Sequence, residues 1–396
     1  MNARLMFSAL SALSALTVAF ADSTVSDVTL EQEKSDRTVT ITYKLTGDDA
    51  IVTVNLLRDG VSIGDEHLTT LCGDVNRLVP ASETDVRTVI WHPDLDWPGQ
   101  RKQPLVAKVT AWSTSAPPDY MVADLTTGEL DSGTIAYYTS TNAFPKGGLT
   151  NDIYRTDKMV FRKIPAKGVT WRMGSPEGEL GRYDTEAAHL VTLRRDYWFG
   201  IFSVTQGQLM RIMKWTDPSS MDAFCLFTNR SCYATRPVQG IGVKTLRSFT
   251  KNYWPAAKHD IDGGTYLSAV RDLFGGSLLF DIPTEAQWEY AARAGKGTSK
   301  VGVYPPNAWG IYDIHGSVAN WCLDWYAPFV ASDAVAVDPV GPETGTQRVY
   351  RGGFWGYIDP NAAAQCRLAS RHGKEPDNNK LSGARHIGFR LCLEIE

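Results

Sequence analysis

Hydrophobic and polar residues alternate in the first third of the chain, as they do in half-buried β-strands. The alternation covers Arg37–Leu45, Ile51–Leu57 and Leu105–Trp112. Turn-forming pairs such as Asp59-Gly60 separate these runs. Short strands at this spacing are typical of two packed antiparallel sheets. We therefore predict an immunoglobulin-like or fibronectin-like β-sandwich domain over residues 22–135.

Helical spacing marks two segments further along the chain. Val204–Met213 has the helical period, and Thr205 is its predicted N-cap. Thr284–Arg293 is the clearest helix, because Thr284 and Gln287 have the spacing of a capping box. Beyond these helices we expect turns and short strands, so the predicted class is α+β.

A polar stretch separates the predicted sandwich from the rest of the chain. Residues 136–158 contain Pro145-Lys146-Gly147-Gly148, a composition that is typical of a linker. The second domain is then predicted over residues 159–396. It opens with strand-like runs at Met159–Ile164 and His189–Leu193.

The first 21 residues have the pattern of a secretory signal peptide. Arg4 gives a positive start, Met6–Phe20 is apolar, and Ala19-Phe20-Ala21 is a small-x-small cleavage site. We therefore expect cleavage after Ala21, no transmembrane span in the mature chain, and a periplasmic, secreted or cell-surface location. The alternative is an uncleaved anchor, although the apolar run is shorter than the roughly 20 residues of a spanning helix.

Charge and cysteine content narrow the class of function. The net charge is −4, with acids and bases interspersed, so we expect no nucleic-acid partner. Six cysteines in an exported chain permit disulfides, and Cys225 and Cys232 have the spacing of a small ring. None of the six forms a CxxC motif, so neither a dithiol redox motif nor a thiolate zinc site is predicted.

Four blocks rich in Trp, Tyr and Gly follow one another in the C-terminal half. They are Asp281–Gly295, Asn307–Trp325, Arg348–Trp355 and Gly388–Leu391. In this order, and after Met173-Gly174-Ser175, they resemble the formylglycine-generating enzyme family, also called the sulfatase-modifying factor family. The resemblance covers about Val160 to Leu393. It implies a C-type-lectin-like fold with little regular secondary structure.

The resemblance also implies where the family's chemistry would lie. Its catalytic members hold two cysteines after an RGG motif; as thiolates these bind Cu(I), and oxygen then converts a sulfatase cysteine to formylglycine. Here Tyr357 stands where the first cysteine is expected, and the second position falls near Ala364. Cys366 lies close, but it matches a structural position of the following strand. We therefore expect no copper site.

A loop in the second block matches a calcium-binding loop of the family. The resemblance assigns ligands to Asp313, to the carbonyls of Gly316 and Val318, and to Asn320. Calcium takes about 6–8 oxygen ligands, and a tight loop supplies several of them. The family usually has Glu where this chain has Asn320, so a negative charge is missing. Calcium is thus a candidate cofactor, beside the alternative of a turn held by its own hydrogen bonds.

Two classes of function stay open. The first is a binding protein in which a cleft of aromatic and arginine side chains holds a peptide, protein or glycan. The predicted cleft residues are Trp309, Trp321, Trp325, Phe354, Trp355, Arg367 and Arg371. We prefer this class because a single thiolate cannot form a two-sulfur copper site. The alternative is that all these aromatics are core and that Arg367, Arg371 and Arg390 brace it through carboxylate pairs.

The second class is an oxidoreductase. It would be a formylglycine-generating enzyme with displaced cysteines that acts on sulfatases, or a divergent metal-dependent oxygenase. For the oxygenase, two of His315, His372 and His386 would hold iron together with Asp359 or Glu375. The position of Cys366 separates the classes, since a second free thiol beside it would favour the enzyme.

Overall fold

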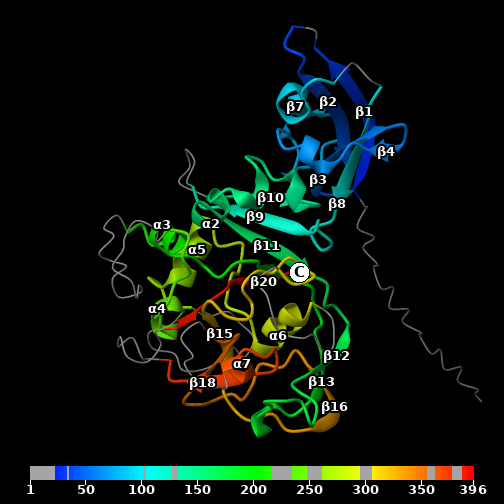
Figure 1. Ribbon diagram of the computed structural model, residues 1–396. Coiled ribbons are helices and arrows are strands. Elements are labelled where there is room, and N and C mark those ends of the chain that lie inside the picture. Colours follow the sequence, from blue (N-terminus) through cyan, green and yellow to red (C-terminus); the bar gives the residue numbers. More distant parts are fainter. Residues whose placement is uncertain are drawn as a thin grey trace, which may run out of the picture.

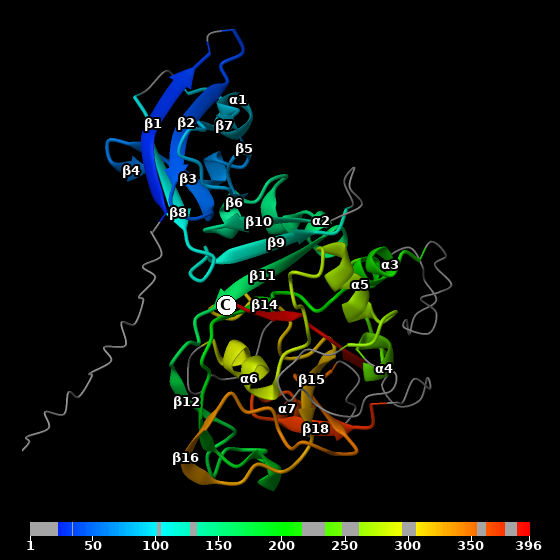
Figure 2. The same cartoon turned by 180° about the vertical axis from the view of Figure 1, so that it is seen from behind.

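A computed structural model of the protein describes residues 23–33, 35–100, 104–126, 133–215, 234–247, 261–294, 306–354, 362–376 and 386–396. Figures 1 and 2 show a smaller N-terminal β unit joined to a larger unit of short strands and helices. The predictions for the signal peptide, Cys225, Cys232, Trp355 and Tyr357 lie outside the described residues. Within those residues, no helix is long and apolar enough to cross a membrane.

The N-terminal unit consists of two sheets around one core, as its alternating sequence predicts. One sheet has the order β1 (Thr24–Gln32), β2 (Val39–Thr46), β7 (Arg87–Trp91), β5 (Cys72–Gly73). The other has the order β4 (Val61–Ser62), β3 (Ala50–Arg58), β6 (Arg77–Val79), with β8 (Val106–Trp112) also paired to β3. Alternate residues of β2 are buried, because successive side chains of a strand point to opposite faces.

A five-stranded antiparallel sheet lies where the two units meet. Its order is β10 (Thr134–Tyr138), β9 (Tyr120–Asp124), β11 (Lys158–Ile164), β14 (Tyr197–Gly200), β20 (Cys392–Glu394). The domain boundary expected at residue 135 therefore lies inside β10, and the larger unit already begins at β9. The stretch expected to be a linker contains α2 (Ile153–Thr156) and packs around Phe144 and Tyr154.

Two further sheets complete the larger unit. One has the order β12 (Thr170–Met173), β13 (His189–Thr192), β16 (Ser332–Val337), and the other β18 (Arg371–Lys374), β17 (Arg348–Arg351), β15 (Ala319–Trp325), β19 (Ile387–Gly388). The remaining helices are α1 (Pro93–Asp96), α3 (Gln206–Ile212), α4 (Val243–Leu246), α5 (Tyr266–Leu273), α6 (Glu285–Arg293) and α7 (Ala362–Gln365). Most elements are short, and the fold is α+β as predicted.

Helix α6 occupies the interior of the larger unit. It lies between β12 and β15 in both views, and each of its nine residues is buried. The predicted capping box is present: Gln287 N–H donates to Thr284 Oγ1 at 3.1 Å, and Thr284 N–H donates to Gln287 Oε1 at 2.9 Å. The predicted cap at Thr205 on α3 has the same reciprocal form. A helix that is buried on all sides must find internal partners for its charged residues.

Candidate functional site

Two glutamates of α6 anchor a buried network of arginines. Glu285 accepts hydrogen bonds from Arg371 at 2.8 and 2.6 Å, and Arg351 lies 3.2 Å from the same carboxylate. Glu289 pairs with Arg293 at 2.6 Å and also with Arg351. Burial alone would raise the pKa of Glu285, but Arg371 and Arg351 outweigh it and hold that pKa below its ordinary value. This network joins α6 to β17 and β18.

Arg367 holds the segment after α7 against the loop before β13. Its guanidinium donates to both oxygens of Glu186, at 2.7 and 2.9 Å, and to Glu179 at 3.0 Å. Arg367 and Arg371, which were predicted to line a cleft, thus pair with buried carboxylates, as the alternative interpretation expects. Their donors are bound inside the protein, which leaves them few contacts to offer a ligand.

Within the described ranges, the guanidinium of Arg390 donates to neutral oxygen atoms and not to a carboxylate. Its Nε–H donates to Asn320 Oδ1 at 3.0 Å, and its other N–H groups donate to main-chain carbonyls. These carbonyls belong to Gly200, Ile201, Tyr312 and Asp313. Burial lowers the pKa of Arg390 to about 10, and it makes no ion pair with any acid that the structure describes. The carboxylate pair expected for this arginine is therefore not found there.

Two of the candidate calcium ligands, Asp313 and Asn320, contact this arginine. Asn320 is 1% exposed, and its amide oxygen accepts from Arg390 and also from Trp288 Nε1 at 3.2 Å. Its amide nitrogen donates to Ser203 Oγ at 3.2 Å, whereas the Asp313 side chain is exposed. No group of three or more His, Cys, Asp or Glu side chains that could hold a metal occurs among the described residues. An amide oxygen already bound to a cation is a poor calcium ligand, so this set does not fit calcium.

Calcium is accordingly expected to leave the melting temperature of the full chain unchanged. A ligand that binds only the folded state stabilises it by an amount that grows with the logarithm of the ratio of free ligand to the dissociation constant, and the melting temperature rises accordingly. The measurement is thermal unfolding in millimolar calcium and in excess chelator, with magnesium as the ionic-strength control. A rise that calcium produces and magnesium does not would contradict this expectation.

The predicted aromatic cleft residues are distributed over two core clusters. Trp321 is fully buried in one of them, and its indole N–H donates to the Ile241 carbonyl at 2.8 Å. Trp325 is buried in the same cluster, with Arg348 over its ring at 3.6 Å. Trp309 packs on the other cluster, and Phe354 stacks on His386 at 4.1 Å. The cause is β15, which is buried on both faces and therefore turns Trp321 and Trp325 inward.

Cys366 lies in a tight, half-buried position next to the RGG turn. A side chain at Gly353 would collide with Cys366 Sγ, and Gly353 has a φ of 68°, so only glycine suits this site. Burial raises the pKa of the Cys366 thiol, which disfavours the thiolate. Residues 354–365 contain no cysteine, and Cys366 makes no disulfide. This segment does not supply the two thiolates that the family's Cu(I) site requires.

The histidines near Cys366 are held by local contacts. His315 Nδ1 lies 3.0 Å from the Cys366 carbonyl oxygen. His372 stacks on Tyr350 and shares a 3.1 Å hydrogen bond with Ser370 Oγ. Burial, and then the charge of Arg351, lower the pKa of His372 to about 4. Among the described residues these histidines form no group of three with acidic side chains that could hold iron, and the candidate ligand Asp359 lies outside those residues.

The four described cysteines are expected to react with a thiol reagent in the order of their exposure. Cys72 is exposed, Cys366 is half-buried, and Cys322 and Cys392 are buried with thiol pKa values well above the ordinary range. Since the thiolate is the reactive species, Cys72 should be alkylated first and Cys366 more slowly. Peptide mass spectrometry after timed iodoacetamide treatment of the native protein measures this order. Modification of Cys366 ahead of Cys72 would mean that Cys366 is an activated thiol.

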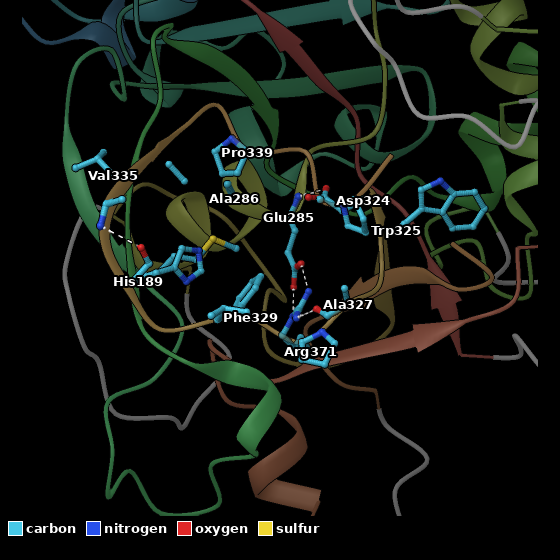
Figure 3. Close-up of a pocket in the computed structure, with 18 residues that line it drawn as sticks. His189, Glu285, Ala286, Asp324, Trp325, Ala327, Phe329, Val335, Pro339 and Arg371 are labelled. Atoms are coloured by element: carbon cyan, nitrogen blue, oxygen red, sulfur yellow. Dashed lines mark hydrogen bonds and ion pairs between the residues drawn. The ribbon is translucent and has the colours of Figure 1, made fainter. Parts of the chain in front are cut away.

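A cavity of about 370 Å³ lies beside the start of α6, and two of the predicted cleft residues, Trp325 and Arg371, are among the residues that line it. Residues 326–342 run around it, and His189 and Phe329 lie across it from Asp324 (Figure 3). Asp324 is 4% exposed, and its Oδ2 accepts from the Glu285 N–H at 2.6 Å. Burial, and then the charge of Glu285, raise the pKa of Asp324 to about 7. The one available signal was an acid within the mostly apolar run of β15.

Comparison with known proteins adds three findings. The chain is 32% identical to a formylglycine-generating enzyme of Thermomonospora curvata over 153 residues, which are 28% of this chain and 49% of that protein. It is 34% identical to the serine/threonine-protein kinase Pkn1 of Chlamydia trachomatis over 163 residues, 35% of this chain and 25% of the kinase. The structure of PvdO from Pseudomonas aeruginosa matches with 22% identity and a TM-score of 0.42, covering 60% of this chain and 94% of PvdO.

The matched part spans about half the length of the formylglycine-generating enzyme of Thermomonospora curvata. The sequence model of the sulfatase-modifying factor enzyme 1-like domain matches residues 155–300 and 296–395. This match includes α6, the 313–320 loop, the RGG turn and the final strand. Because it covers more than half of the chain, the protein belongs to the sulfatase-modifying factor enzyme 1-like domain family.

Proposed function

We propose that this protein is a non-catalytic member of its family that binds a polypeptide ligand outside the cytoplasm. The observation that carries the proposal is the single sulfur in the family's catalytic segment. Cys366 is the only cysteine between the RGG turn and β18, and its buried thiol favours the protonated form. A linear Cu(I) site needs two neighbouring thiolates. Formylglycine chemistry therefore lacks its metal ligands in this segment.

The cavity beside α6 supports a binding role. Its walls are mainly apolar, and its size lies within the range of about 300–1,000 Å³ that is usual for small-ligand pockets. Val330 and Val335 on its rim are 79% and 44% exposed. Exposed apolar residues around a pocket mark a site that a partner covers. A polypeptide side chain suits such walls better than a glycan, which needs many polar contacts.

The family itself does not fix the activity. A protein named as a kinase shares this region with the chain at an identity similar to that of the formylglycine-generating enzymes. The domain thus occurs in proteins of different names, and the residues of each chain must decide its chemistry. Export follows from the signal-peptide pattern of residues 1–21 and is part of this proposal.

The deciding experiment is a turnover assay with copper. Purified full-length protein is loaded with Cu(I) and incubated with oxygen and a sulfatase-motif peptide, and the peptide is followed by mass spectrometry. We expect no formylglycine, whereas a catalytic family member assayed in parallel produces it. Formylglycine formed in repeated turnovers, and lost in Cys366→Ser, would overturn the proposal and establish the oxidoreductase instead.

A further inference from the structure

We infer that the cavity beside α6 binds a primary ammonium group on an aliphatic chain, as in a lysine side chain, with Asp324 as its counter-ion. The inference rests on the proposed binding function and names the chemical class that the site selects. It begins from an imbalance of charge on the cavity wall. Two carboxylates lie there side by side, and only one of them has a cationic partner.

Glu285 and Asp324 differ in their partners although both are buried. Glu285 is paired with Arg371 and Arg351. Asp324 makes no ion pair with any residue in the described part of the chain, and its contacts are with the main-chain N–H groups of Glu285 and of Asp324 itself. A buried carboxylate without a cation is expensive, and proteins keep such groups chiefly at functional sites. Asp324 is therefore the group that a ligand would satisfy.

The cavity wall offers no free cation that would favour an anionic ligand. Arg371 is the one arginine among the lining residues. Its N–H groups donate to Glu285 and to the carbonyls of Thr185 and Ala327. The wall thus presents the carboxylate of Asp324, which lacks a positively charged partner among the described residues. Beside it lies the guanidinium of Arg371, whose N–H groups already donate within the protein. The complementary ligand is a cation that donates hydrogen bonds.

The other walls specify what carries the cation. They are formed by the apolar side chains of Met173, Phe329, Val330, Val335, Pro339 and Pro342. Figure 3 shows the ring of Trp325 turned away from the cavity, so its aromatic face is not presented as a cage for a quaternary ammonium group. An aliphatic chain gains about 0.8 kcal/mol per buried CH₂ on such a surface. A flexible chain that ends in a primary ammonium group matches both parts of the wall.

Binding should depend on pH, because only the ionised form of Asp324 attracts a cation. The groups that face Asp324 are Glu285 from α6, Arg371 from β18, Arg348 from β17 and, across the cavity, His189 from β13. With its pKa at about 7, Asp324 is mostly neutral at pH 6 and mostly ionised at pH 8. An alkylamine keeps its charge over this range. The affinity for an amine should therefore rise about tenfold from pH 6 to pH 8.

The test is a ligand-observed NMR titration of the full chain with n-pentylamine, and with n-pentanol as the uncharged probe. Asp324→Asn keeps an oxygen for the Glu285 N–H but removes the charge. Asp333→Asn removes one exposed charge from β16 and is the matched control, since Asp333 is not among the cavity-lining residues. We expect Asp324→Asn to weaken pentylamine binding about tenfold or more at pH 8 and to abolish its pH dependence. Pentanol binding and the Asp333→Asn variant should be little changed.

Three results would overturn the inference. They are equal binding of pentanol and pentylamine, full pentylamine binding by Asp324→Asn, and no pentylamine binding by the wild type at pH 8. A pH dependence that persists in Asp324→Asn would also count against Asp324. None of these outcomes creates formylglycine, so each leaves the proposed non-catalytic function in place. Conversely, formylglycine turnover would remove that function without changing the pentylamine result.

Discussion

Replacing Arg351 with methionine is expected to lower the free energy of unfolding by about 3–5 kcal/mol, because it breaks a buried ion network. Arg351 is fully buried and contacts both glutamates of α6. Its two terminal guanidinium nitrogens also donate to the carbonyls of Ala369 and Leu368, at 3.0 and 2.8 Å. Methionine fills similar space but leaves these acceptors without donors. The measurement is urea unfolding of the full chain, followed by tryptophan fluorescence.

Arg194→Met is the matched control for that substitution. Arg194 pairs with Asp338, but its side chain is 74% exposed. Exposed ion pairs contribute about 0–1 kcal/mol, so this variant should unfold close to the wild type. If Arg351→Met lost no more stability than Arg194→Met, the buried network would not be a main support of the fold. A change in the slope of the urea transition would instead indicate an altered unfolded or intermediate state.

The features of the fold that depend only on residues close together in the sequence could be predicted from it. The capping box of α6 needs only Thr284 and Gln287, and the alternation of β2 needs only its own eight residues. Both signals survive in the structure because a local hydrogen bond or a two-residue period does not depend on distant segments. The four sequence blocks predicted the family of the larger unit, and the match to the family model confirms that prediction.

The domain boundary depended on contacts between distant residues. β9 and β10 follow the strands of the N-terminal unit directly along the chain. However, β10 pairs with β9, and β9 pairs with β11 of the larger unit. β10 also touches the N-terminal unit, where the Tyr137 N–H donates to the Asn76 carbonyl at 2.7 Å. Sequence alternation shows that a strand has two faces but does not show which strand it joins. The stretch around Phe144, which is polar in composition, likewise packs into a small core of its own.

The candidate site was harder to predict for the same reason. Trp321 and Trp325 were expected in a cleft, but β15 is covered on both faces and carries them into the core. Asp324, between them, drew no attention because an isolated acid is usually exposed. Its burial beside Glu285 joins residues 39 positions apart, and nothing local to either residue announces it. The feature on which the ligand proposal depends is thus visible only in three dimensions.

Asp324→Asn is expected to stabilise the protein at pH 8 and to leave it nearly unchanged at pH 4. The folded pKa of Asp324 is about 7, well above the value of 3.8 for an unperturbed aspartate, so its folded form resists ionisation. The protonated carboxyl group of Asp324 adds to the free energy of unfolding at pH values below its pKa in the unfolded chain. This contribution is lost as the pH rises through 7. Asparagine stays neutral throughout. The gain of the variant over the wild type should therefore grow from near zero at pH 4 to about 2–4 kcal/mol at pH 8.

The control for this prediction is the same substitution at another buried acid. Asp281 is 2% exposed, but it is paired with Arg247 at 3.2 Å, so Asp281→Asn should destabilise the protein at both pH values. Urea unfolding of both variants and the wild type at pH 4, 6 and 8 separates the two cases. An Asp324→Asn variant whose stability relative to the wild type does not increase as the pH rises would show that the ionised carboxylate of Asp324 does not destabilise the fold. Asp324→Asn could prove both more stable than the wild type and unable to bind amines. In that case the charge of Asp324 destabilises the fold and is retained because it binds the ligand.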